Sequence, residues 1–147
     1  MKDLPVGPVT LYYDGRCPLC MREIGWLARH ARDGNLRLVD VNDQLALACE
    51  QVPPVERLRA VLHVRLADGR WLTGVDATVA AWQAAGVGGR ISWLLWPPVK
   101  PLADLLYAGF ARYRHALARA LGQYVCDRQC WQESDDAVRQ HFRRRPF

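Results

Sequence analysis

Residues 9–20 of the chain read Val-Thr-Leu-Tyr-Tyr-Asp-Gly-Arg-Cys-Pro-Leu-Cys. The first five are β-branched, aromatic or leucine, a composition typical of a short buried strand. The Asp14-Gly15 pair that follows favours a turn, and Pro18 suits the first turn of a helix because its missing N–H would be unpaired there anyway. The stretch therefore predicts a strand that passes through a turn into a helix, with Cys17 at the junction.

The flanking segments extend this pattern into an α/β core. The helix that starts at Pro18 is expected to end at Asp33-Gly34-Asn35, whose residues tolerate positive φ, and a second strand at 36–41 completes a parallel strand-helix-strand unit. The next expected elements are helices within 43–59 split at Pro53-Pro54, strands at 61–66 and 70–73 joined by a turn at Asp68-Gly69, and a helix at 77–85 capped by Asp76.

The last third of the chain has a helical pattern throughout. One apolar stripe continues for about five turns, which predicts a helix that packs against the core, and its members are Leu102, Leu106, Phe110, Tyr113, Leu117 and Leu121. Ser134-Asp135-Asp136 is expected to cap a short final helix. The segment 91–106 contains Trp93 and Trp96, which we expect in the buried core, and its prolines and charges interrupt any membrane span.

The order of these elements is that of a thioredoxin core. We therefore predict an α/β fold with a thioredoxin-like core (βαβ-α-ββα) at residues 1–90 and a C-terminal helical extension at residues 91–147 packed on it. A chain of 147 residues suffices for one substantial core, so we expect a single domain, 1–147.

Composition excludes several classes of function. The net charge is +5, but the arginines are scattered and no basic run is interleaved with aromatic residues, so we expect no nucleic-acid partner. No stretch is long and apolar enough for a membrane span or a secretory signal, which predicts a cytoplasmic protein. Because cytoplasmic thiols are kept reduced, the five cysteines are unlike a structural disulfide framework, and their spacing becomes the clue to function.

The spacing of Cys17 and Cys20 indicates thiol-disulfide chemistry. Residues three apart at a helix start have Cα atoms on the order of 5 Å apart, within the roughly 4.4–6.8 Å range of disulfides. At the N-cap, unpaired N–H groups and the helix dipole favour a Cys17 thiolate, while Cys20 lies one turn deeper and should stay protonated. We expect Cys17 to attack a disulfide and Cys20 to resolve the mixed disulfide, with no bound cofactor.

Residues 13–20 resemble the Asp-x-x-Cys-x-x-Cys signature of the DCC family of predicted thiol-disulfide oxidoreductases. Asp68-Gly69-Arg70, Trp96-Pro97-Pro98 and the segment from Tyr107 to Arg114 resemble later blocks of that family, so the resemblance covers most of the chain. It implies a redox enzyme whose substrate is a disulfide- or thiol-containing protein or small molecule. Thioredoxins carry a proline before the third strand that receives the substrate backbone; residues 58–61 contain none, which favours a narrower or small-thiol substrate.

Three neighbours are expected to support the thiols. Pro18 starts the helix, Arg16 places a cation beside Cys17, and Asp14 either relays a proton for Cys20 or shapes the turn with Gly15.

The roles of the other cysteines stay open at this stage. Cys126 and Cys130 are buried apolar residues, a second redox pair, or half of a four-thiolate zinc site with Cys17 and Cys20. The competing hypothesis for the whole chain is accordingly a zinc-stapled domain, or a redox-inactive thioredoxin-like binding module that uses a surface around Trp93 and Trp96.

Overall fold

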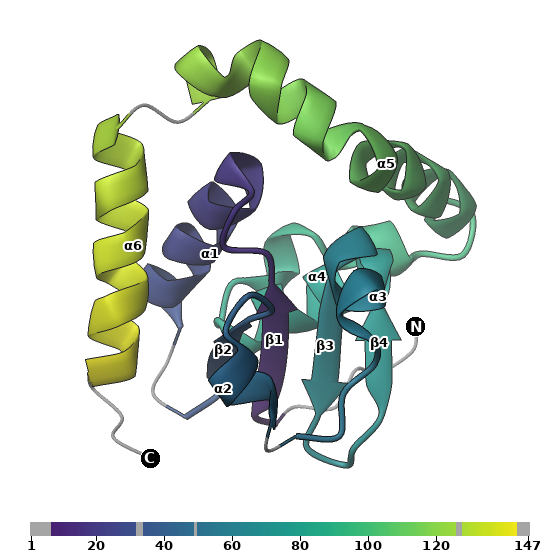
Figure 1. Ribbon diagram of the computed structural model, residues 1–147. Coiled ribbons are helices and arrows are strands. Elements are labelled where there is room, and N and C mark those ends of the chain that lie inside the picture. The colour runs from purple at the N-terminus through teal and green to yellow at the C-terminus, as the bar shows by residue number, and fades with distance from the viewer. Residues whose placement is uncertain (1–6, 32–33, 49, 126–127, 144–147) are drawn as a thin grey trace.

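A four-stranded mixed sheet forms the centre of the protein (Figure 1). The computed structural model describes residues 7–31, 34–48, 50–125 and 128–143. The strands lie in the order β2-β1-β3-β4, where β1 pairs in parallel with β2 and antiparallel with β3, and β3 pairs antiparallel with β4. Their bounds are β1 Val9–Tyr13, β2 Leu36–Asp40, β3 His63–Leu66 and β4 Trp71–Thr73.

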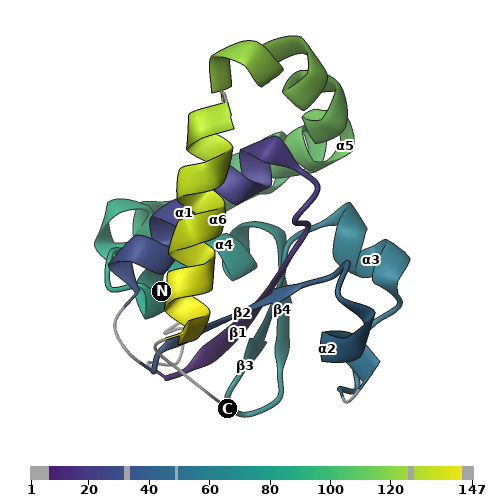
Figure 2. The same ribbon diagram turned by 60° about the vertical axis from the view of Figure 1, so that its left-hand side comes forward.

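Helices cover both faces of the sheet (Figure 2). Helices α1 (Pro18–His30) and α4 (Gly74–Ala84) lie on one face, and the short helices α2 (Gln44–Ala48) and α3 (Val55–Ala60) lie on the other. Alternate residues of β1 point to opposite faces of the sheet, so they pack against the two different layers of helices. Leu11 packs with α1 and α4 residues, whereas Tyr12 packs with Leu47 and Leu58 of the opposite layer.

This arrangement confirms the predicted mixed α/β, thioredoxin-like fold. The turn residues act as the sequence indicated, because Gly34, Gly69 and Gly86 all have positive φ, a conformation that costs glycine little. The break between α2 and α3 falls before Pro54, which stands at the N-cap of α3.

Two predicted helix caps are wrong. Helix α4 starts at Gly74, with Thr73 at the N-cap, so Asp76 lies in the first turn, where its carboxylate pairs with Lys100 at 3.0 Å. The Ser134-Asp135-Asp136 segment lies inside helix α6, which begins at Arg128. Asp135 forms an ion pair with Arg139 one turn later, at 2.9 Å, an i,i+4 pairing that favours continuation of the helix.

The C-terminal part consists of two short 3-10 turns, η1 (Gly88–Arg90) and η2 (Ser92–Leu95), and two long helices, α5 (Lys100–Val125) and α6 (Arg128–Arg143). Helix α5 passes over the end of α1 nearest β1, and α6 runs alongside α1 in both views (Figures 1 and 2). Ala137 and Val138 of α6 join the main core, and the His141 ring bonds to the carbonyl oxygen of Leu36 at 2.7 Å. Among the described residues, no helix is both long and apolar enough to cross a membrane.

The orientation of α5 contradicts the predicted packing. Its inward face carries Ala103, Tyr107, Arg114 and Ala118, and the alanines allow the helix to lie close to its neighbours. The stripe expected in the core points to solvent instead. We call this side of the helix the outer face of α5. Its exposed residues are those of the predicted stripe, Leu102, Leu106, Phe110, Tyr113, Leu117 and Leu121, together with Leu105. Trp93 and Trp96, also expected in the core, are 59% and 60% exposed.

Candidate functional site

Cys17 and Cys20 lie at the junction between β1 and α1, as predicted. Cys17 is the N-cap of α1, its N–H donates to the carbonyl oxygen of Asp14 at 3.1 Å, and its own carbonyl oxygen accepts the N–H of Met21 at 2.9 Å. Pro18 occupies the first helical turn. Both cysteines are free thiols. The turn after β1 therefore fixes the first sulfur at the end of the helix, and the helix places the second one turn later.

The two cysteine residues are both largely enclosed. Cys17 has no exposed surface, and Cys20 is partly exposed. The helix stripe that carries Cys20 was predicted correctly at Ile24 and Leu27, which are buried.

The pKa of Cys17 is lowered to about 6. The largest cause is a hydrogen bond from the Cys20 thiol to the Cys17 sulfur, because a donor stabilises the thiolate. Burial opposes this effect by raising the pKa. The backbone N–H of Cys20 and the charges of Arg114 and His115 lower the pKa further. The lowered pKa favours the thiolate form of Cys17 near neutral pH.

The pKa of Cys20 is raised instead. Its thiol is the donor to Cys17, and loss of the proton would remove that hydrogen bond and place two negative sulfurs side by side; burial raises the pKa further. Glu23, one turn along α1, adds a repulsive charge. Burial also raises the pKa of Glu23 itself, and the indole N–H of Trp82 donates to its carboxylate at 2.9 Å.

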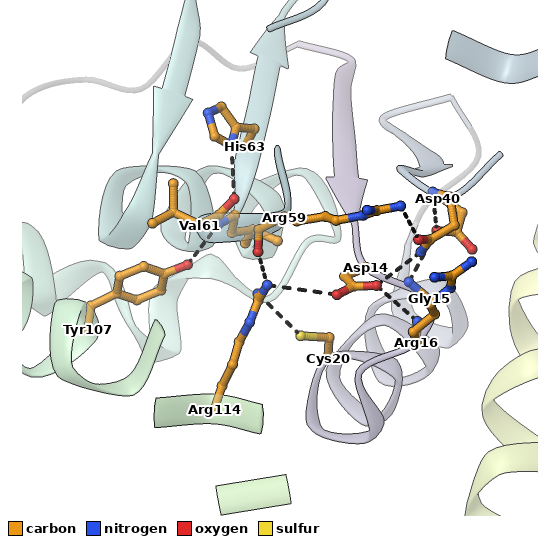
Figure 3. A network of polar contacts seen from close by, with 12 residues as sticks. Asp14, Gly15, Arg16, Cys20, Asp40, Arg59, Val61, His63, Tyr107 and Arg114 are labelled. Carbon is orange, nitrogen blue, oxygen red and sulfur yellow. Dashed lines mark hydrogen bonds and ion pairs between the residues drawn. The ribbon is translucent and has the colours of Figure 1, made fainter. Parts of the chain in front are cut away.

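Arg114 reaches the thiols from α5, almost a hundred residues later in the chain (Figure 3). Its guanidinium is buried and lies 3.8 Å from the Cys20 sulfur and 3.8 Å from an Asp14 carboxylate oxygen, and it donates to the carbonyl oxygen of Arg59. No chemical signal in the sequence connects Arg114 with Cys20, and only the family resemblance singled this arginine out. The buried cation stabilises negative charge on both the carboxylate and the thiolate.

Asp14 shapes the turn between β1 and α1. One carboxylate oxygen accepts the backbone N–H of Arg16 at 3.1 Å and the side-chain amide of Asn42 at 3.0 Å. Burial raises the pKa of Asp14, but these two hydrogen bonds and the charge of Arg114 outweigh it and lower the pKa overall. The Arg16 side chain is exposed, and the charges that lower the pKa of Cys17 come from Arg114 and His115.

The segment before β3 is tied to α5 by hydrogen bonds. The N–H of Leu62 donates to the hydroxyl of Tyr107 at 3.0 Å, and the carbonyl oxygen of Arg59 accepts from Arg114 (Figure 3). Two backbone groups beside the thiols are thus occupied by side chains of α5.

We call the turn between β1 and α1 (residues 14–17) the redox turn. A cavity of about 340 Å³ adjoins this turn on the side of α6. It is lined by Tyr13, Gly15, Met21, Asp40, Gln132 and Asp135. Its volume is at the lower end of the range for small-molecule sites.

The predicted second thiol pair cannot be placed beside the first. Cys126 lies outside the described residues, and Cys130 lies in α6 but its side chain is also outside them. Within the described ranges, no group of three or more histidine, cysteine, aspartate or glutamate side chains is arranged to hold a metal ion.

The lowered pKa of Cys17 predicts the pH at which its thiolate forms. The ultraviolet absorbance of thiolate in the reduced protein should rise with a midpoint near pH 6, because the Cys20 thiol stabilises the charged form. Cys20→Ala, which removes the donor, should move this midpoint upward, toward the value of about 8.5 for a free cysteine. Cys17→Ser is the control and should remove the transition. A midpoint near pH 8.5 in the parent protein would contradict the assigned geometry.

Comparison with known proteins places this site in a family. An uncharacterized chloroplastic protein of Arabidopsis thaliana is 30% identical over 108 residues, which are 72% of this chain and 50% of the plant protein. The chain thus spans about half the length of this curated relative. No solved structure matches the chain. The profile described as DCC1-like thiol-disulfide oxidoreductase matches residues 11–120, which include Cys17, Cys20 and Arg114, and the chain therefore belongs to the DCC1-like thiol-disulfide oxidoreductase family.

Proposed function

We propose that the chain catalyses thiol-disulfide exchange, with Cys17 as the nucleophile and Cys20 as the resolving thiol. The observation that carries this proposal is the position of Cys17 at the N-cap of α1, where the Cys20 thiol one turn later donates a hydrogen bond to its sulfur and lowers its pKa. A reactive thiolate next to a thiol that keeps its proton is what a two-step exchange requires.

The exchange conserves atoms and electrons. The Cys17 thiolate attacks one sulfur of the substrate disulfide, so that a mixed disulfide forms and the other substrate sulfur leaves as a thiolate. Cys20 then loses its proton and attacks the Cys17 sulfur, which releases the second substrate thiolate. The protein gains the Cys17–Cys20 disulfide and the substrate gains two electrons; the reverse sequence oxidises a dithiol.

The proton of Cys20 needs an acceptor, and the two nearby carboxyl groups differ in suitability. Asp14 is stabilised as a carboxylate by its hydrogen bonds and by Arg114, which lowers its proton affinity. Glu23 has a raised pKa and interacts electrostatically with Cys20. A carboxyl group with raised proton affinity is the better acceptor near neutral pH, so we assign this role to Glu23 rather than to Asp14.

Single replacements of the two cysteines test their roles. Cys20→Ser should accumulate a mixed disulfide at Cys17, because no resolving thiol follows the first attack. Cys17→Ser should lower the rate of disulfide reduction to background. Mass spectrometry of the intact protein after reaction with a model disulfide, together with a turnover assay, measures both outcomes. If both variants turn over as fast as the parent protein, the assignment is wrong.

We propose further that the substrate is a small disulfide rather than an extended polypeptide. In thioredoxins, the segment before the third strand receives the substrate backbone. Here the N–H of Leu62 and the carbonyl oxygen of Arg59 are already bonded to Tyr107 and Arg114. A polypeptide must displace these contacts, whereas the cavity beside the redox turn has a volume suited to a small molecule.

This preference can be measured by comparing a small disulfide, such as glutathione disulfide, with the interchain disulfides of insulin. If polypeptide docking needs a minor conformation in which α5 has moved, the second-order rate constant for insulin should be roughly tenfold to a thousandfold lower. Stopped-flow absorbance under single-turnover conditions provides both constants. Equal rate constants, or a faster reaction with insulin, would exclude the small-substrate proposal and leave the exchange chemistry intact.

A further inference from the structure

The outer face of α5 is a long apolar surface that no described residue covers. Leu105 and Leu106 are 70% and 65% exposed, and none of the large apolar residues of this face is buried. The helix has 26 residues and is about 39 Å long. At 3.6 residues per turn, the seven residues of the face span an arc of roughly 160°, wider than the apolar stripe of an ordinary surface helix. Such a surface marks an interaction site.

The position of this surface leaves it open to a flat partner. Helix α5 lies at the outer edge of the molecule in both views (Figures 1 and 2). Trp93 and Trp96 are exposed just before the helix, and the carbonyl oxygen of Trp96 accepts the N–H of Lys100 at 2.8 Å, which fixes it to the first turn. Exposed tryptophans are typical of the boundary between lipid and water.

The charges beside the outer face favour an anionic partner. Arg112 and Arg119 are exposed and project roughly 20–40° beyond Leu105 around the helix. The acid of α5 among the described residues is Asp104, and it is already paired with Lys100 at 2.8 Å. A second copy of this chain would bring arginines of the same sign to the apolar contact, whereas an anionic lipid surface would neutralise them.

We infer that the outer face of α5 docks the protein on an anionic lipid surface. The helix lies in the boundary between the lipid and water. Its leucines and the two tryptophans are at the level of the headgroups and acyl chains, and Arg112 and Arg119 are beside the lipid phosphates. The adjoining inward face of the same helix carries Arg114 and Tyr107, so docking holds the redox turn close to the membrane.

Flotation of the reduced protein with phospholipid vesicles tests this inference. The protein should float with vesicles of equal parts phosphatidylglycerol and phosphatidylcholine, with less binding as salt is raised, and much less with phosphatidylcholine alone. Leu105→Glu and Leu106→Glu, each made singly, should lose binding because they place a carboxylate on the apolar face. The matched control is Leu45→Glu in α2, where the parent leucine is 85% exposed outside this surface, and it should bind normally.

The charge contribution has its own variant. Replacing both Arg112 and Arg119 with Gln should weaken binding to the anionic vesicles roughly tenfold or more. Circular dichroism of each variant verifies that the fold is intact. The inference would be overturned if the parent protein failed to float, or if it bound equally to both vesicle types. It would also be overturned if the parent protein bound no vesicles and instead formed a dimer that Leu106→Glu dissociates.

Discussion

The buried guanidinium of Arg114 is the interaction on which the rest of the site depends. A cation removed from water is costly unless its surroundings supply negative charge and hydrogen-bond acceptors. Here Asp14, the sulfur of Cys20 and the carbonyl oxygen of Arg59 surround it, and these groups come from the redox turn, α1 and the end of α3. One side chain thereby fixes α5 over the thiols and stabilises the thiolate of Cys17.

This arrangement explains why α5 has its alanines inward and its leucines outward. The polar contacts of Arg114 and Tyr107 set the side of the helix that faces the core, and Ala103 and Ala118 on that same side permit close approach. A sequence stripe of leucine, phenylalanine and tyrosine would ordinarily indicate the buried side. In α5 the hydrogen bonds to Arg59 and Leu62 and the contact with Asp14 outweigh that tendency, and the apolar stripe remains available to a partner.

The local signals in the sequence predicted the core accurately. The strand before Asp14, the turn glycines and the proline at the helix start each act within a few residues, and β1 and the start of α1 lie where these residues placed them. Long-range features were not accessible in the same way. The approach of Arg114 to Cys20 depends on how α5 crosses the start of α1, which no periodicity within α5 could encode. Asp76 failed as a predicted cap because the helix begins at Gly74, which has a φ of 62°, with Thr73 at the N-cap, three residues before the predicted start.

Peptide mapping tests most directly whether Cys17 and Cys20 form a reversible redox pair. Trypsin releases both cysteines in one peptide, Cys17 to Arg22. After mild oxidation and alkylation of free thiols, this peptide should be lighter than its reduced, unalkylated form by two hydrogen atoms, and treatment with dithiothreitol before alkylation should yield the doubly alkylated peptide. If the peptide stays doubly alkylated after oxidation, or if either cysteine is found linked to a different thiol in the parent protein, Cys17 and Cys20 do not form a reversible redox pair.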